Sequence, residues 1–133
     1  MAAADFQDTC AAGAPRFLVL IVEDEVLIRM LLSDALRQAG YNVIEAANAD
    51  EAMSVLDTSP SPDVLITDVR MPGSIDGFEL AAHVRRTKPR LKVIITSGHA
   101  GPDRAVGVAD AFLPKPYELA LIIRRVQALT EAP

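Results

Sequence analysis

The sequence contains a single cysteine, Cys10, and no run of apolar residues long enough to cross a membrane. One cysteine cannot form a disulfide within the chain, so the fold does not depend on an oxidising compartment and we expect a cytoplasmic location. Residues 1–15 lack both the basic start and the apolar core of a secretory signal peptide. These absences argue against secretion and against a membrane partner.

Basic residues are also in short supply, because 13 lysines and arginines stand against 18 aspartates and glutamates, for a net charge of −5. Binding to DNA, RNA or anionic membranes depends on clustered Lys and Arg, so this balance argues against a nucleic-acid partner. The chain has no Gly-rich phosphate loop ending in Gly-Lys-Ser/Thr, which argues against a nucleotide-binding protein. It also has no His or Cys with zinc-ligand spacing.

What the chain does contain is the composition of a packed domain, with 50% apolar and 23% charged residues among 133. Residues 1–15 are small, polar and without periodicity, so we expect a flexible N-terminal leader there. The rest of the sequence predicts one domain over residues 16–129 and a short C-terminal tail over residues 130–133.

Apolar runs of strand length alternate with segments of helical period along this domain. The predicted strands are residues 17–22, 41–46, 63–67, 92–96 and 111–113. The predicted helices are residues 25–40, 48–57, 77–87 and 117–130, with Asn48 as an N-cap and Gly40 as a C-cap. Strands that are apolar throughout are typical of a parallel sheet covered on both faces. The pattern therefore predicts an α/β fold with a doubly wound, five-stranded parallel sheet.

Polar side chains of catalytic type follow the ends of four predicted strands: Glu23 and Asp24, then Asp68, then Thr96 and Ser97, and finally Lys115. Each has a simpler explanation when taken alone, as acids at a helix start, an aspartate in a turn or a surface lysine. In an open parallel sheet, however, ligands bind at the carboxyl ends of the strands, so one fold brings all of these groups into one crevice.

Three carboxylates, those of Glu23, Asp24 and Asp68, would then lie close together. Two like charges about 4 Å apart repel by roughly 4 kcal/mol at an effective dielectric of about 20, so three require a counter-charge. Carboxylate, water and phosphoryl oxygens as ligands fit Mg²⁺ better than Ca²⁺ or Zn²⁺. With the metal bound, Asp68 can accept a phosphoryl group while Lys115 and Ser97 stabilise the charge on the transferred oxygens.

Four segments, "VLIVEDEVLIR", "DVRMPGSIDGFEL", "IITSG" and "FLPKP", resemble in order and position the signature regions of the receiver domain of two-component response regulators. The resemblance covers about residues 16–129 and implies a flavodoxin-like, CheY-like fold of strand order 2-1-3-4-5. It implies that Asp68 accepts a phosphoryl group from a histidine kinase or a histidine phosphotransfer protein. It also implies signalling through contacts with an unknown downstream protein.

The resemblance further implies a set of Mg²⁺ ligands, which are Glu23, Asp24, Asp68 and the backbone carbonyl of Arg70. Lys115 would bind the phosphate, and the peptide bond between Lys115 and Pro116 is expected to be cis. Chemistry would be limited to self-catalysed phosphorylation and dephosphorylation of Asp68, so the protein would not be an enzyme in the ordinary sense.

Ser97 would be the switch hydroxyl that turns toward the phosphoryl group, and Phe112 the aromatic side chain that moves with it. Thr96 directly precedes Ser97, but the family places a small residue after the switch hydroxyl, and Gly98 follows Ser97. His99 occupies a position that borders the phosphoryl group in the family.

Two of the departures of the sequence from the family concern the length of a segment. The loop after Asp68 is one residue longer than usual, with Ser74 as the extra residue. Residues 98–111, "GHAGPDRAVGVADA", are short by about one helical turn and contain glycines and a proline, which weaken a helix by roughly 1 and 3 kcal/mol each. The fourth helix of the family is therefore predicted to be very short or irregular, and the usual interaction face that it forms cannot be assumed.

The chain stops after the last predicted helix, which leaves no room for a winged-helix or helix-turn-helix output domain. We therefore expect a stand-alone receiver that is a monomer or a weak dimer. One alternative is a receiver cut from a larger regulator. Another is a phosphatase of the haloacid dehalogenase type, which also uses an aspartyl nucleophile after a strand, although that family has a second Asp where this sequence has Arg70.

Overall fold

The computed structural model describes residues 16–58, 60–99 and 101–131. Its elements are β1 (Leu18–Val22), α1 (Val26–Gln38), β2 (Asn42–Ala46), α2 (Ala49–Leu56), β3 (Val64–Asp68), α3 (Gly77–Thr87), β4 (Lys92–Ser97), the 3₁₀ turn η1 (Pro102–Ala105), β5 (Ala111–Pro114) and α4 (Leu119–Thr130). The strands form one parallel sheet in the order β2-β1-β3-β4-β5. The predicted sheet is thereby confirmed, whereas the predicted leader over residues 1–15 lies outside the described residues.

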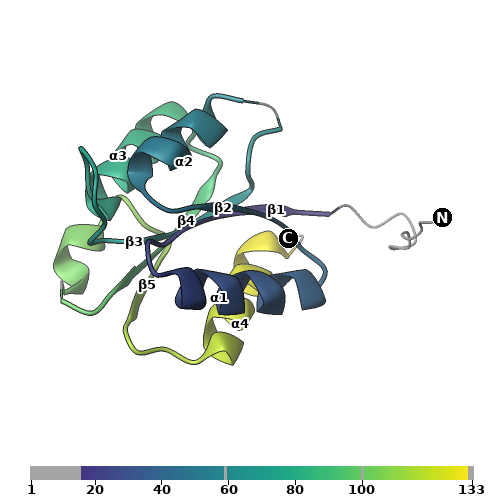
Figure 1. Ribbon diagram of the computed structural model, residues 1–133. Coiled ribbons are helices and arrows are strands. Elements are labelled where there is room, and N and C mark those ends of the chain that lie inside the picture. Colours follow the sequence, from purple (N-terminus) through teal and green to yellow (C-terminus); the bar gives the residue numbers. More distant parts are fainter. Residues whose placement is uncertain (1–15, 59, 100, 132–133) are drawn as a thin grey trace.

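The sheet is buried on both faces, as Figure 1 shows, with α2 and α3 above it and α1 and α4 below it. Leu20 and Val22 of β1 pack in the hydrophobic cluster that includes α2 and α3 residues. Val19 and Ile21, the alternate residues of the same strand, pack in the cluster that includes α1 and α4 residues. Because successive strand residues point to opposite faces, a strand covered twice must be apolar at every position. This explains the uninterrupted apolar runs in the sequence.

The helix ends show how local sequence sets the element boundaries. Asn48 caps α2 as predicted, because its side-chain oxygen accepts a hydrogen bond from the backbone N–H of Glu51 at 2.8 Å. At the end of α1 the prediction was wrong by one residue, since the C-cap is Ala39 and not Gly40. Gly40 follows with φ of +99°, the left-handed conformation in which a glycine without a Cβ is favoured just after a helix.

The described part of the segment between β4 and β5 holds the single turn η1 and no full helix. The prediction of a shortened fourth helix is therefore confirmed. The turn is held against α3 by Arg104, whose guanidinium carbon lies 4.3 Å from the centre of the Phe78 ring. The same side chain lies 3.9 Å from the carboxylate of Asp76.

The last helix begins two residues later than predicted, at Leu119. Ile122 and Val126 are fully buried against the sheet, whereas Leu119, which the helical period places on the same face of the helix, is 36% exposed. The helix end is bonded to the residue that precedes β2, because the hydroxyls of Tyr41 and Thr130 form a hydrogen bond of 2.9 Å. Within the described ranges, no helix has the length and apolar character needed to cross a membrane.

Candidate functional site

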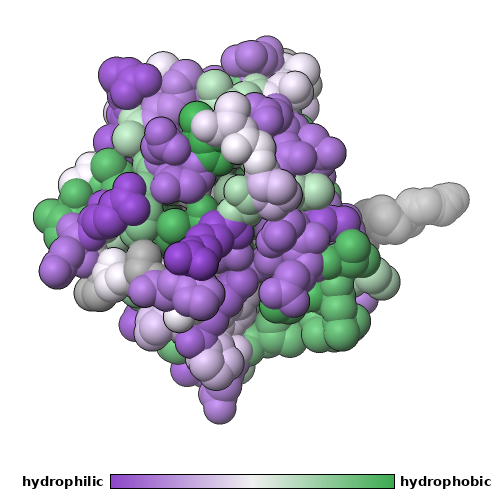
Figure 2. Space-filling model, turned by 60° about the vertical axis from the view of Figure 1, so that its left-hand side comes forward, coloured by the Kyte–Doolittle hydropathy of each residue, from purple (hydrophilic) through white to green (hydrophobic). Residues whose placement is uncertain are grey.

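The carboxyl ends of the strands meet at one edge of the sheet, on the left in Figure 1, because all five strands are parallel. Figure 2, in which this side comes forward, shows mostly hydrophilic residues at its centre. A cavity of about 200 Å³ lies at this edge. It is lined by the last residues of β3 and β4 and by the loops after β1, β3, β4 and β5: Asp24, Glu25, Asp68, Arg70, Ser97, Gly98, His99 and Lys115. Residues far apart in the sequence are thus brought together as predicted.

Three acids form the negative part of this site. Carboxylate oxygens of Glu23, Asp24 and Asp68 lie within 4.8 Å of one another. Glu23 and Asp68 are buried, with 3% and 8% of their surface exposed, while Asp24 is open to solvent. A donor set made only of carboxylate oxygens, with one open side for water or a phosphoryl oxygen, fits a hard cation such as Mg²⁺.

Lys115 supplies the positive charge nearest to these acids. Its Nζ atom donates hydrogen bonds to Glu23 Oε1 at 2.9 Å and to Asp68 Oδ2 at 3.1 Å. One ammonium beside three carboxylates leaves two negative charges, which a divalent cation would balance. The peptide bond between Lys115 and Pro116 is cis, as expected.

Burial and charge shift the pKa values of two of these groups in a way that follows from their contacts. Burial raises the pKa of the Glu23 carboxyl, and the hydrogen bonds from Lys115 and from the N–H of Glu25 offset this only in part. Burial alone would lower the pKa of Lys115, but the hydrogen bond to Glu23 and the charge of Asp68 outweigh it and raise that pKa. Lys115 is therefore held in its charged form at neutral pH.

Asp68 is the last residue of β3, the middle strand of the sheet. Its Oδ1 atom accepts a hydrogen bond from the N–H of Val69 at 2.8 Å, and its Oδ2 atom accepts the hydrogen bond from Lys115. The start of α3 packs directly on the backbone here, because Gly77 N–H donates to Val69 O at 2.9 Å. A Cβ on Gly77 would lie 2.1 Å from Asp68 O. The sequence did not reveal this close approach, although a glycine at the first position of a helix hints at one.

The two neighbouring hydroxyls at the end of β4 point to different surroundings. Ser97 lines the cavity, and its Oγ accepts a hydrogen bond from the N–H of His99 at 3.1 Å. Thr96 is not among the lining residues, and its Oγ1 lies 3.5 Å from the carbonyl oxygen of Thr67. Phe112 is half-buried in the cluster beneath α2 and α3 and does not reach the cavity lining. The geometry favours Ser97 over Thr96 as the hydroxyl that can meet a ligand.

Comparison with known proteins agrees with this geometry. The sequence model described as Response regulator receiver domain matches residues 19–127. The chain belongs to the response regulator receiver domain family. Receiver domains are phosphoacceptor switches of two-component signalling that act with histidine kinases and downstream effectors, and they bind Mg²⁺ at their acidic pocket.

Two curated proteins similar to this receiver domain are much longer than it is. The chain is 36% identical over 124 residues to the DNA-binding transcriptional regulator NtrC of Salmonella typhimurium, covering 87% of this chain and 26% of NtrC. It is 39% identical over 118 residues to the sensor kinase CckA of Brucella abortus, covering 85% of this chain and 12% of CckA. The similarity therefore spans only a minor part of either relative.

A solved structure shares the fold over nearly its whole length. The response regulator protein TrrA of Thermotoga maritima, in complex with Mg(2+)-BeF, matches this receiver domain with a TM-score of 0.76 and 30% identity. The match covers 85% of this chain and 98% of that one. The predicted CheY-like architecture is therefore confirmed both by the strand order and by this likeness.

Ser74, which is predicted from the sequence to be an extra residue, lies in the loop between β3 and α3. Its hydroxyl donates to Asp50 Oδ1 in the first turn of α2 at 2.8 Å. The preceding Gly73 has φ of +125°, which favours glycine. Three residues further on, α3 starts with a capping box in which Asp76 and Glu79 bond each other's backbone N–H at 2.9 Å. The loop between β3 and α3 is thus tied to α2, and α3 begins with its own cap.

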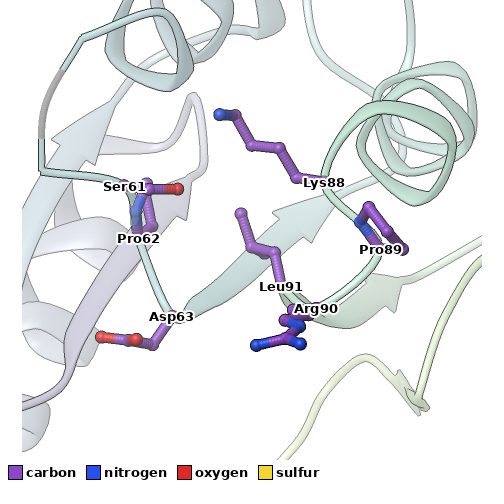
Figure 3. A pocket seen from close by; sticks show the side chains of 7 residues that line it. All are labelled: Ser61, Pro62, Asp63, Lys88, Pro89, Arg90 and Leu91. Atoms are coloured by element: carbon purple, nitrogen blue, oxygen red, sulfur yellow. The ribbon is translucent and has the colours of Figure 1, made fainter.

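A second cavity, of about 450 Å³, lies at the opposite edge of the sheet, where β3 and β4 begin. Figure 3 shows its lining, which consists of Ser61, Pro62, Asp63, Lys88, Pro89, Arg90 and Leu91. In Figure 3 the Asp63 carboxylate points away from Lys88, and Asp63 Oδ2 accepts a hydrogen bond from the N–H of Leu18 at 2.8 Å. This cavity lacks the converging acids and lysine of the first, which makes the first the candidate site.

Proposed function

We propose that this receiver domain accepts a phosphoryl group on Asp68 from a histidine kinase or a histidine phosphotransfer protein. The observation that carries the proposal is the position of Asp68, at the end of the middle strand, beside Glu23 and Asp24 and bonded to Lys115. In the transfer, a carboxylate oxygen of Asp68 forms a bond to phosphorus while the bond from phosphorus to the donor imidazole nitrogen breaks. The imidazole leaves with the bonding electron pair.

The remaining site residues have roles that their positions support. Glu23, Asp24, Asp68 and the backbone carbonyl of Arg70 would hold Mg²⁺, whose charge offsets that of the phosphoryl oxygens when it is bound. Lys115 would exchange one of its carboxylate contacts for a phosphoryl oxygen, since its ammonium already lies at Asp68. Ser97 would donate its hydroxyl hydrogen to the phosphoryl group, and Phe112 would move with it to signal the change.

A protein partner is favoured by the surface next to the site. Helix α1, which begins two residues after Asp24, exposes a set of large apolar side chains, namely Val26, Leu27, Met30 and Leu31. A hydrophobic area also adjoins the hydrophilic centre in Figure 2. Exposed apolar patches mark contact surfaces for proteins, while the net charge of −5 disfavours nucleic acid. The proposal therefore has the kinase or phosphotransfer protein and a downstream protein as partners, in the cytoplasm.

The proposal includes a stand-alone mode of action, as a monomer or a weak dimer. The match to TrrA supports this mode, because the chain covers 98% of that solved protein. The matches to NtrC and CckA support the alternative of a receiver within a larger regulator, because the chain covers only 26% and 12% of these proteins. Both modes use the same phosphorylation site.

Incubation of the protein with a small phosphodonor tests the proposed chemistry. We expect intact-protein mass spectrometry to show one added phosphoryl group in the presence of Mg²⁺ and none when the metal is removed with a chelator, because the charge of the site needs a divalent cation. Steady release of phosphate over many turnovers without a phosphorylated protein would contradict the proposal and favour a hydrolase.

A further inference from the structure

Arg29 lies outside the cavity, on the second turn of α1, yet its side chain reaches back to the turn that carries the site acids. Its Nη1 atom donates to the backbone oxygen of Glu23 at 2.8 Å. Its Nε atom donates to Glu45 Oε1 of β2 at 3.1 Å, in an ion pair whose side chains are 17% and 27% exposed. One guanidinium thus connects α1, β2 and the turn between β1 and α1.

The contact with the Glu23 backbone matters because of the residue that follows. The carbonyl of Glu23 and the N–H of Asp24 belong to one planar peptide unit, so a donor that fixes the carbonyl also fixes the direction in which the chain reaches Asp24. The rest of Glu23 is already held, by its N–H on Ala46 O at 3.0 Å and by its carboxylate contacts with Lys115 and the N–H of Glu25. Arg29 supplies the last of these constraints.

Asp24 itself depends on this backbone support. Its side chain is exposed, and within the described ranges it has no hydrogen bond or ion pair to another side chain that would hold it in place. Glu23 and Asp68, in contrast, are both held by Lys115. The position of the Asp24 carboxylate is therefore set mainly by the peptide that joins it to Glu23.

We propose that Arg29 is a positioning residue for the divalent-cation site, which orients Asp24 through the peptide bond between Glu23 and Asp24. Glu45 acts indirectly, because it holds the Arg29 guanidinium in the orientation in which Nη1 donates to the Glu23 carbonyl. The role needs an arginine, since Nε and Nη1 engage two different partners and a lysine has one nitrogen for both. This inference rests on the proposed function, in which Asp24 helps to hold Mg²⁺.

The chain contains a matched control for the loss of charge. Arg37 also pairs with Glu45, through Nη2 and Oε2 at 3.5 Å, and its second contact is the carbonyl of Val43. Unlike Arg29, it has no contact with Glu23. Replacing Arg37 therefore removes the same charge and disturbs the same glutamate, but it leaves the peptide before Asp24 untouched.

Calorimetric titration of Mg²⁺ alone into the full chain tests the inference. We expect Arg29→Gln and Arg29→Lys each to raise the Kd for Mg²⁺ by about tenfold or more, as is typical when a group that orients a metal ligand is lost. Arg37→Gln is expected to change the Kd by less than about twofold, because exposed ion pairs contribute little. At saturating Mg²⁺ the rate of phosphorylation of Arg29→Gln is expected to return to that of the wild type.

Thermal unfolding of each variant shows whether it is folded, and Glu45→Gln serves as a second, milder variant with a smaller expected rise in Kd. An unchanged Kd for Mg²⁺ in Arg29→Gln would overturn the inference and leave the proposed function intact. An unchanged Kd in Arg29→Lys would also overturn it, because it would show that the site requires only a positive charge at this position. If the wild-type protein binds no Mg²⁺, the inference and the metal site of the proposed function fail together.

Discussion

Protein carrying Asp68→Asn takes up no phosphoryl group from a small phosphodonor in the presence of Mg²⁺, whereas wild-type protein takes up one. The amide of asparagine is not a nucleophile toward phosphorus, and the loss of one negative charge also weakens the attraction for a divalent cation. Asparagine has nearly the volume of aspartate, and its one amide oxygen can still accept the hydrogen bond from the Val69 N–H, whereas the bond from Lys115 to Oδ2 is lost and Lys115 keeps its bond to Glu23. The variant is therefore expected to fold, and intact mass spectrometry measures the loss directly.

Asp34→Asn is the matched control for this experiment. Asp34 lies on α1 and is exposed, so the substitution makes the same chemical change away from the cavity. We expect Asp34→Asn to be phosphorylated like the wild type. Uptake of a phosphoryl group by Asp68→Asn at the wild-type rate would mean that another side chain is the acceptor.

Gly77→Ala is expected to destabilise the folded protein by about 3 kcal/mol, because the new methyl group overlaps backbone atoms of β3. Its Cβ would lie 2.1 Å from Asp68 O and 2.9 Å from the backbone carbon of Asp68 and the Cα of Val69. These are backbone atoms at the end of β3, so they cannot turn aside as a flexible side chain would. Relief of the clash requires α3 to move away from the strand that carries Asp68.

The sign of the change in stability distinguishes the steric clash from the effect of helix propensity. On propensity alone, alanine in place of glycine stabilises a helix by about 1 kcal/mol. Gly101→Ala is the control, since a Cβ at Gly101 meets nothing within 4 Å and its φ of −84° is open to any residue. We expect the melting temperature of Gly77→Ala to fall by about 10 °C or more and that of Gly101→Ala to stay near the wild-type value. An unchanged melting temperature for Gly77→Ala would contradict the close approach of α3 to β3.

The parts of the fold that the sequence predicted are those that depend on local pattern. Uninterrupted apolar runs predicted doubly covered strands, and the glycines and proline between β4 and β5 predicted the shortened helix there. The rule that ligands lie at the carboxyl ends of parallel strands then brought Asp24, Asp68, Ser97 and Lys115 to one cavity. Side-chain exposure was less predictable, since Leu119 lies on the periodic stripe of α4 yet is partly open to solvent.

The features that the sequence did not reveal depend on how close two distant segments come. Nothing in the order of residues shows that Arg29 reaches both Glu45 and the Glu23 carbonyl, and the position of Gly77 at a helix start only hints that it lies against the backbone of Asp68. The contact of Lys115 with two carboxylates at once is of the same kind, because it depends on the loop geometry after β5. Such contacts are set by packing between elements and leave no periodic signal in the chain.

Identification of the modified side chain tests the central claim that Asp68 carries the phosphoryl group. Wild-type protein treated with phosphodonor and Mg²⁺ is reduced with borohydride, which converts an acyl phosphate of aspartate to homoserine, and the peptides are sequenced by mass spectrometry. We predict homoserine in place of Asp68 in the peptide that spans β3 and the start of α3, and unmodified Asp68 without phosphodonor. Conversion at Asp24 or another acid, with Asp68 unchanged, would contradict the claim.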